Sequence, residues 1–234
     1  MNDSISILLK KIQGARLFIF DLDGTVVDLE DLNFGLFHEI IREKLHEEIS
    51  NEEYQQYISG RGSFTGFEQY LAAHSLDINQ ADDLHLLFLA KKQRGLHTNY
   101  ATHVRIQPGV VEFLSFLKNM QKHTALATST GKEFSTLILT QSELSIYFEL
   151  ILDREDVAQI KPDPEIFNKA LQYFQTKPGE AIVFEDSING IQAAHSAGIF
   201  CVGIHNQGRN DAFISHADAV IEEFTDLSSL WNVA

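Results

Sequence analysis

The stretch that decides the fold runs from Arg16 to Asp28 and reads RLFIFDLDGTVVD. Its first half is a short apolar run, which favours a strand buried on both faces of a parallel sheet. Two carboxylates, Asp21 and Asp23, follow where this strand would end, and Gly24 comes next. Ligands of open α/β sheets bind beyond the carboxyl ends of the strands, so the stretch predicts a site at that edge. A simple Asp-Gly turn is the alternative interpretation.

The composition narrows the class of protein. The chain has 234 residues, 44% of them hydrophobic, which suffices for a sizeable core in one or two domains. Eighteen Lys and Arg against 33 Asp and Glu give a net charge of -15, which disfavours binding to nucleic acid. The single cysteine, Cys201, lies in an apolar run and is expected to be a buried structural thiol. We find no signal-peptide pattern and no run long enough to span a bilayer, so we expect a soluble cytoplasmic protein without a membrane partner.

Strands and helices alternate over much of the chain. Apolar runs predict further strands at 123–127, 149–152, 181–184, 199–204 and 219–221, with helical patterns between them. This alternation predicts an α/β fold with a doubly wound, mainly parallel sheet. Two helix ends are marked: Asp163 is the expected N-cap before Pro164, and Gly198 is the expected glycine after a helix from Ile188 to Ala197.

A second region has no strand signal. Helical patterns cover residues 34–45, 52–58, 66–76 and 81–96, and the first places Phe34, Phe37, Ile41 and Leu45 on one face. The region is too long for a loop, so we interpret it as an inserted helical domain at 30–103. Residues 1–29 and 104–234 then form the α/β core. The loop 60–63 carries Arg61 between two glycines.

The predicted strands end in polar residues that suit phosphoryl chemistry. These residues are Asp21, Asp23, Thr128, Ser129, Lys161, Glu185 and Asp186. Carboxylates without nearby His or Cys favour a hard cation, and Mg²⁺ is the expected one. Hydroxyls and a lysine suit a phosphoryl group. One carboxylate can act as the nucleophile that forms an aspartyl-phosphate, and a second can protonate the leaving oxygen and then activate water.

In order along the chain these residues form four motifs, namely Asp21 with Asp23, Thr128 with Ser129, Lys161, and Glu185 with Asp186. The four motifs resemble those of the haloacid dehalogenase-like (HAD) superfamily, in the branch of β-phosphoglucomutase and phosphoglycolate phosphatase. The resemblance covers nearly the whole chain and implies a Rossmann-like core with a helical cap that selects the substrate. It implies Asp21 as the nucleophile and Asp23 as the general acid and base. The resemblance implies phosphate contact for Thr128, Ser129 and Lys161. It further implies a contact between Lys161 and Asp21.

The same resemblance implies where Mg²⁺ binds. Asp186 is an implied ligand, with Glu185 in or near the coordination shell. Asp21 would bind the metal through its carboxylate and Asp23 through its backbone carbonyl. Dehalogenases of the superfamily lack an aspartate at the position of Asp23, so its presence favours phosphoryl transfer.

We therefore expect a Mg²⁺-dependent phosphatase that acts on a small phosphorylated metabolite, such as a sugar phosphate or phosphoglycolate. A β-phosphoglucomutase is the alternative, although Asn33 stands where such mutases often have a histidine. Arg61, offset from the basic cap residues of the mutase, is the expected cap contact to substrate. A phospho-accepting signalling module is less favoured, because it takes its acid pair and its acceptor aspartate from different strands. We expect a monomer or a weak dimer.

Overall fold

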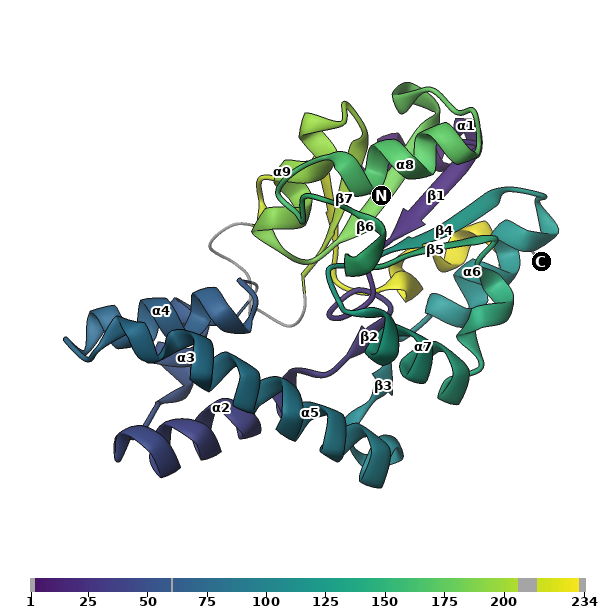
Figure 1. Cartoon of the computed structure of the whole chain (residues 1–234). Helices are drawn as coiled ribbons and strands as arrows, with labels where there is room; N and C mark the ends of the chain where they lie inside the picture. The colour runs from purple at the N-terminus through teal and green to yellow at the C-terminus, as the bar shows by residue number, and fades with distance from the viewer. Residues whose placement is uncertain (1–2, 60, 206–213, 232–234) are drawn as a thin grey trace. The chain divides into compact units, whose positions relative to one another are not determined.

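The computed structural model describes residues 3–59, 61–205 and 214–231. Six strands within them form one sheet in the order β5-β4-β1-β6-β7-β8, and every neighbouring pair is parallel (Figure 1). The strands are β1 (Leu17–Phe20), β4 (His123–Ala127), β5 (Leu150–Leu152), β6 (Ala181–Glu185), β7 (Phe200–Ile204) and β8 (Ala219–Ile221). The predicted α/β class with a parallel sheet is confirmed.

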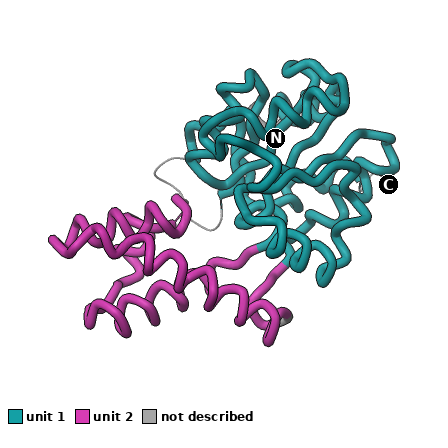
Figure 2. The backbone as a smooth tube through the Cα atoms, viewed as in Figure 1, with its two compact units in different colours: residues 1–27, 106–234 teal, residues 28–105 magenta. Residues whose placement is uncertain are grey.

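The chain divides into two compact units, one of residues 1–27 with 106–234 (unit 1) and one of residues 28–105 (unit 2) (Figure 2). The predicted boundaries, 29/30 and 103/104, differ from these by two residues each. Strands β2 (Val27–Asp28) and β3 (Arg105–Ile106) form a two-stranded sheet at the two points where the chain passes between the units. Unit 2 therefore begins at residue 28, shortly after Asp21 and Asp23.

The sheet belongs to unit 1, whose described residues also include five α-helices. These are α1 (Asp3–Gly14), α6 (Val110–Asn119), α7 (Lys132–Gln141), α8 (Glu165–Tyr173) and α9 (Ile188–Ser196). Short 3₁₀ segments of this unit are η2 (Leu144–Tyr147), η3 (Arg154–Asp156), η4 (Pro178–Glu180) and η6 (Phe224–Leu230). None of the helices among the described residues combines the length and the apolar composition that crossing a bilayer requires.

Strand β1 explains why helices cover both faces of the sheet. It lies between β4 and β6, and all four of its residues are buried. Leu17 and Ile19 share a buried cluster with residues of α8 and α9. Phe18 and Phe20 contact Phe113 of α6, with ring centroids 6.1 and 6.2 Å apart. Successive side chains of a strand point to opposite faces, so one apolar run supplies two cores. Replacing Phe20 by alanine is expected to cost about 3–5 kcal/mol of stability.

Unit 2 is helical in its described residues, as the missing strand signal indicated. It contains α2 (Glu30–Leu45), α3 (Asn51–Tyr57), α4 (Ser63–Ala73), η1 (Ile78–Gln80) and α5 (Ala81–His103). Its centre is aromatic. The ring centroid of Phe37 lies 4.4 Å from that of Phe67, 4.8 Å from that of Phe88 and 5.8 Å from that of Tyr54. Phe37 on α2 thus contacts helices α3, α4 and α5.

Three details of the helices differ from the sequence prediction. The buried face of α2 includes Leu36 and Ile40, whereas Phe34 and Leu45 are only half-buried. A helix packed against several others buries a stripe wider than the predicted one. Helix α5 continues past 96 to His103, through non-helical backbone angles at Asn99.

The third difference is the start of α8. Pro164 immediately precedes the first helical residue, Glu165, so Asp163 is not the N-cap. The Asp163 carboxylate still accepts the N–H of Glu165 at 2.9 Å, from one position further out. The expected glycine after α9 is confirmed, because Gly198 follows the C-cap with a φ of +71°. Cys201 is a buried free thiol, as expected.

Candidate active site

Polar residues at or just after the ends of three neighbouring strands of unit 1 come together at one edge of the sheet. The last residue of β1, Phe20, pairs with Phe184 of β6 and with Leu126 of β4. Because the strands are parallel and in register, the residues after these positions leave the sheet side by side. They are Asp21, Asp23, Thr128, Ser129, Glu185 and Asp186.

Lys161 lies at the centre of this edge. Its Nζ donates to Asp21 Oδ1 at 2.7 Å, to the Ala127 carbonyl at 2.8 Å and to Glu185 Oε1 at 2.5 Å. Only 5% of Lys161 is exposed, and an ammonium has three donors, so all three are used inside the protein. The sequence separates Lys161 from Asp21 by 140 positions, and the fold brings them into direct contact.

The charges of this network shift the pKa values of its members. Burial raises the pKa of Asp21 to about 7; Lys161 opposes this rise, and the charge of Glu185 adds to it. Burial would lower the pKa of Lys161, but the charges of Asp21 and Glu185 outweigh that effect and raise it above its ordinary value. Two carboxylates share one ammonium, so this edge carries an excess of negative charge, which adds to the effect of burial on the pKa of Asp21.

Glu185 is the most enclosed member of the network, with no exposed surface. Its Oε1 accepts from Lys161, while its Oε2 accepts from the N–H of Ser187 at 3.2 Å and from the Ser187 hydroxyl at 2.9 Å. A Cβ at Gly190 would lie 1.9 Å from the Glu185 carboxyl carbon, so only glycine fits there. Glu185 therefore fixes Lys161 and the start of α9 as well as adding a negative charge.

The turn after Asp21 places Asp186 beside the network. Gly24 has a φ of +90°, and a Cβ there would lie 1.9 Å from Asp186 Oδ2. The Thr25 hydroxyl donates to Asp186 Oδ1 at 3.3 Å. Asp23 is half-buried in the same turn. The glycine is needed for the positive φ and for the close approach of the Asp186 carboxylate.

These carboxylates suit a divalent cation. One oxygen from each of Asp21, Glu185 and Asp186 lies within 4.8 Å of the others. An all-oxygen donor set with excess negative charge suits Mg²⁺, which prefers carboxylates and water to nitrogen or sulfur. The residues present therefore fit the metal expected from the sequence. The metal contact predicted for the Asp23 backbone carbonyl stays a prediction.

Thr128 and Ser129 follow β4 at the same edge. Thr128 is 1% exposed, and its Oγ1 accepts the N–H of Thr130 at 3.1 Å. A hydroxyl that accepts in this way keeps its own hydrogen to donate, which suits an anionic ligand. Ser129 is exposed. Phosphate contact by both residues stays a prediction.

Arg61 belongs to unit 2, next to Gly60, which lies outside the described residues. Its guanidinium donates to the Ser59 carbonyl at 3.0 Å, and the Ser59 hydroxyl donates to Glu30 at 2.8 Å. Burial lowers the pKa of Arg61. These contacts hold Arg61 within its own unit, and its role in substrate binding stays a prediction.

One supporting residue was missed in the sequence. Gln107 donates its side-chain amide to the Gly24 carbonyl at 3.1 Å and its N–H to the Val26 carbonyl at 3.0 Å. These two hydrogen bonds stabilise the turn that carries Asp23. The sequence signal was weak, because a glutamine just before Pro108 has no distinctive pattern.

Comparison with known proteins places this site in a family. The haloacid dehalogenase-like hydrolase family matches residues 18–204. A phosphoglycolate phosphatase from Thiobacillus denitrificans is 31% identical over 198 residues, which cover 83% of this chain and 86% of the relative. A phosphorylated carbohydrates phosphatase from Thermotoga maritima is 30% identical over 185 residues, covering 77% of this chain and 81% of the relative.

A solved structure shows the same fold. The crystal structure of CbbY from Rhodobacter sphaeroides in complex with phosphate has a TM-score of 0.74 at 22% identity, and the match covers 94% of this chain and 100% of that one. The family match spans most of the chain and includes every core motif derived above. This protein is therefore an enzyme of the haloacid dehalogenase-like hydrolase family.

Proposed function

We propose that this enzyme is a Mg²⁺-dependent phosphatase that hydrolyses small phosphate monoesters, of the sugar phosphate or phosphoglycolate class, through an aspartyl-phosphate on Asp21. The observation that carries the proposal is the buried Lys161, which contacts Asp21 and Glu185 at the edge of the sheet where Thr128 also lies. The names of the relatives support a phosphatase of small phosphorylated compounds.

The first half of the reaction transfers the phosphoryl group to the enzyme. The Asp21 carboxylate attacks phosphorus, and the bond between phosphorus and the substrate oxygen breaks. Asp23, entering as the carboxylic acid, gives its proton to that oxygen, so the product leaves as a neutral alcohol. The Thr128 hydroxyl donates to a phosphoryl oxygen, and the positive charge of the neighbouring Lys161 compensates the charge of the phosphoryl group.

The second half releases inorganic phosphate. Asp23, now a carboxylate, takes a proton from water as the water oxygen attacks phosphorus. The bond between phosphorus and Asp21 breaks, and both carboxyl groups return to their starting protonation states. Mg²⁺ held by Asp21, Asp186, Glu185 and the Asp23 carbonyl would supply further positive charge against the phosphoryl oxygens.

The raised pKa of Asp21 bears on the need for metal. A nucleophilic carboxylate must be ionised, and burial raises the pKa of Asp21 to about 7 even though the neighbouring Lys161 opposes this rise. Positive charge beside Asp21 lowers this pKa and keeps the nucleophile ionised at neutral pH. The proposal therefore expects activity to depend strictly on a divalent cation.

A screen of phosphorylated metabolites tests the proposal. With Mg²⁺, inorganic phosphate should be released from several small monoesters and from p-nitrophenyl phosphate. EDTA should abolish this release, excess Mg²⁺ should restore it, and Ca²⁺ should support it poorly because of its looser coordination. Full turnover in chelator would contradict the metal assignment.

The mutase alternative has its own test. With β-glucose 1-phosphate and a bisphosphate primer, we expect phosphate release and little glucose 6-phosphate. Rapid isomerisation with almost no phosphate release would identify a mutase instead.

A separate experiment tests the aspartyl-phosphate. Acid quenching during turnover of a substrate radiolabelled in its phosphate should trap label on the wild-type protein, at Asp21.

A further inference from the structure

The chain continues to pair beyond the ends of β4 and β5. The N–H of Thr128 donates to the Leu152 carbonyl at 3.0 Å, and the N–H of Arg154 donates to the Thr130 carbonyl at 3.3 Å. The first bond completes the parallel pairing of the two strands, and the second links the segments that follow them. The two bonds join the loop of residues 128–132, which carries the Thr128 hydroxyl, to the segment of residues 152–156.

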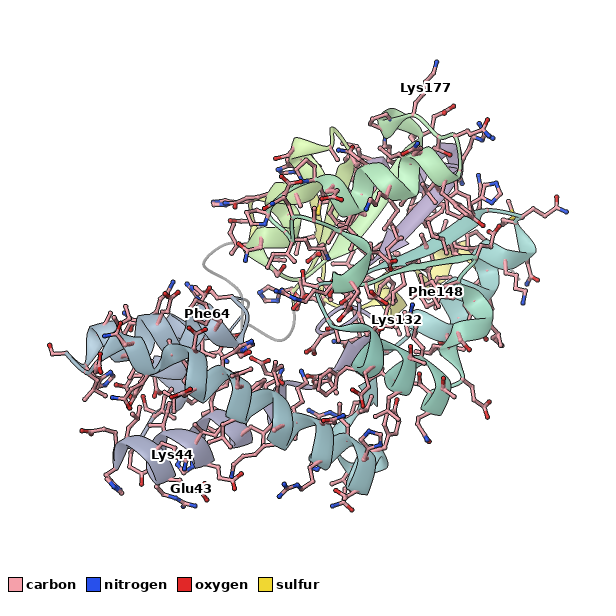
Figure 3. All side chains as sticks on the ribbon, in the orientation of Figure 1. Glu43, Lys44, Phe64, Lys132, Phe148 and Lys177 are labelled. Atoms are coloured by element: carbon pink, nitrogen blue, oxygen red, sulfur yellow. The ribbon has the colours of Figure 1, made fainter. Side chains whose placement is uncertain are left out.

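A carboxylate completes this connection. Helix α7 begins at Lys132, which Figure 3 labels, and its N-cap is Gly131, which has no side chain to accept a helix N–H. Glu155 takes that role from across the loop: its Oε2 accepts the Lys132 N–H at 2.8 Å. A Cβ at Gly131 would lie 3.2 Å from Glu155 Oε1. The bond from the Lys132 N–H lowers the pKa of Glu155, so the side chain is ionised at neutral pH.

Glu155 is itself held in place. The buried Asp153 accepts the Glu155 N–H through Oδ1 at 3.1 Å, and the Asp153 N–H donates to Asp156 Oδ2 at 3.0 Å. The backbone that carries Glu155 is therefore fixed on both sides. A carboxylate placed in this way can orient the loop that it contacts.

Resting on the proposed function, we propose that Glu155 is a positioning residue for phosphate binding. It holds the first N–H of α7 and so fixes the 128–132 loop in the conformation that presents the Thr128 hydroxyl. Glu155 contacts the loop and needs no contact with the substrate. It also occupies the Lys132 N–H, so the phosphoryl group is directed to other donors of the loop.

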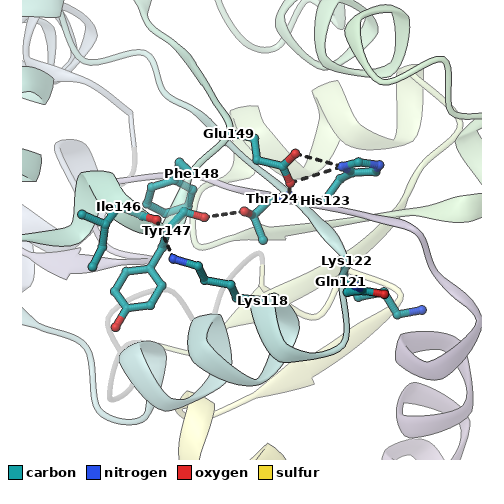
Figure 4. Close-up of a pocket in the computed structure, with 9 residues that line it drawn as sticks. All are labelled: Lys118, Gln121, Lys122, His123, Thr124, Ile146, Tyr147, Phe148 and Glu149. Atoms are coloured by element: carbon teal, nitrogen blue, oxygen red, sulfur yellow. Dashed lines mark hydrogen bonds and ion pairs between the residues drawn. The ribbon is translucent and has the colours of Figure 1, made fainter.

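Glu149 provides a matched control at the opposite ends of the same two strands. It precedes β5 and accepts the Thr124 N–H of β4 at 3.3 Å, and it pairs with His123 at 3.0 Å. These residues line a cavity of about 320 Å³ (Figure 4). Glu149 and Glu155 thus make similar contacts with β4 and its continuation, but only Glu155 does so where the site residues lie.

The test compares Glu155→Ala, Glu155→Gln and Glu149→Ala in the full chain with Mg²⁺. Steady-state kinetics on p-nitrophenyl phosphate give KM and kcat, competition gives the inhibition constant of inorganic phosphate, and thermal unfolding gives Tm. Glu155→Ala should raise KM and the phosphate inhibition constant about tenfold, roughly the effect of losing one helix cap, while kcat changes less.

The two other variants separate positioning from stability. In Glu155→Gln the amide oxygen can still accept the Lys132 N–H, so both constants should stay within about twofold of wild type. Glu149→Ala should lower Tm without changing either constant. If Glu155→Ala does not fold, Glu155→Asp replaces it, because its shorter side chain draws the acceptor away from Lys132 and should raise both constants.

Three results would overturn the inference. Unchanged phosphate binding in Glu155→Ala would do so, as would equal kinetic effects of Glu155→Ala and Glu149→Ala. A Glu155→Gln variant as weak as Glu155→Ala would show that charge, and not the hydrogen bond, matters. In each case wild-type turnover leaves the proposed phosphatase intact, whereas a wild type that neither releases nor binds phosphate rejects both proposals.

Discussion

The sheet edge of unit 1 that carries the candidate active site and the interior of unit 2 bury different kinds of side chain. The edge buries charge: Lys161, Asp21 and Glu185 are each at most 7% exposed, and Lys161 donates to both carboxylates. Unit 2 buries aromatic rings around Phe37, and its ion pairs, such as that of Lys91 with Glu39, include well-exposed side chains. Buried charges are tolerated only when every partner is present, whereas an aromatic core accepts changes of similar volume.

This difference predicts how the two regions respond to substitution. Removing one member of the buried network leaves another charge uncompensated. Substitutions there should therefore have large effects, chiefly on turnover. Exposed pairs contribute little to stability, so changes on the surface of unit 2 should act on substrate preference if they act at all. Four predictions test this contrast, in order of expected size.

The largest effect is expected at Asp21. Asp21→Asn should lower turnover by at least about 10³-fold and abolish the trapped phosphoenzyme, because an amide is not a nucleophile at phosphorus. Its Tm in metal-free buffer at pH 8 should not fall. The neutral asparagine avoids the energetic cost of burying a negative charge, which is the main cause of the raised pKa of Asp21. Asp23→Asn is the control: it should slow proton transfer while phosphate still binds. Near wild-type turnover of Asp21→Asn would disprove the nucleophile assignment.

Next comes a pair of glycines, one in each unit. Gly24→Ala would place a Cβ 1.9 Å from Asp186 Oδ2 at a φ of +90°, so it should lose most activity and about 1–3 kcal/mol of stability. A Cβ added at Gly35, within α2, would meet no neighbouring atom within 4 Å. Gly35→Ala should therefore stabilise the protein by up to about 1 kcal/mol. Urea unfolding and Mg²⁺ titration of activity measure both variants, and equal behaviour of the two would contradict the contrast.

A smaller effect is expected at Arg61. Arg61→Ala should raise KM about fivefold for the preferred anionic substrate and change turnover of p-nitrophenyl phosphate much less, because only the former offers a distal anion. Lys44→Ala, which removes an exposed cation of α2, is the matched control and should leave both substrates unaffected. An unchanged substrate profile for Arg61→Ala would remove Arg61 from the site.

The smallest effect concerns the stability of the segment beside the site. Burial, and to a lesser extent the negative charge of Asp156, raise the pKa of Asp153 from 3.8 to about 6. The folded state then binds this proton more readily than the unfolded state, so the ionised group destabilises the fold above about pH 6 and ceases to do so as the pH falls towards 4. Asp153→Asn, which keeps an oxygen for the Glu155 N–H, should raise Tm at pH 8 and lose that advantage at pH 4.

Glu165 supplies the opposite sign for the same measurement. The hydrogen bond from Lys169 lowers its pKa from 4.5 to about 2, so its ionisation stabilises the fold above pH 4.5, and this stabilisation is lost as the pH falls towards 2. Glu165→Gln should therefore lower Tm at pH 8. Identical pH profiles of Tm for the two variants and the wild type would refute both assignments.

Several features could be read from the chain alone. The strand that ends at Phe20 was evident because four apolar residues precede two carboxylates, and the ends of parallel strands must meet at one edge. The predicted limits of the inserted region, 30–103, follow from where the strand signal stops and returns, and they lie two residues inside those of unit 2. Both predictions rest on local periodicity and on the residue types at strand ends, and both of these can be recognised within short continuous segments of the sequence.

Other features needed the folded chain. The strand order puts β1 between β4 and β6, and this order lets Lys161 reach Asp21 and Glu185 at once. The contacts of Gln107 with Gly24 and of Glu155 with Lys132 join residues 83 and 23 positions apart, and no spacing rule connects them. Such contacts depend on which segments the sheet makes neighbours. That choice is a property of the whole packed core and not of any single stretch, so only the tertiary structure could reveal it.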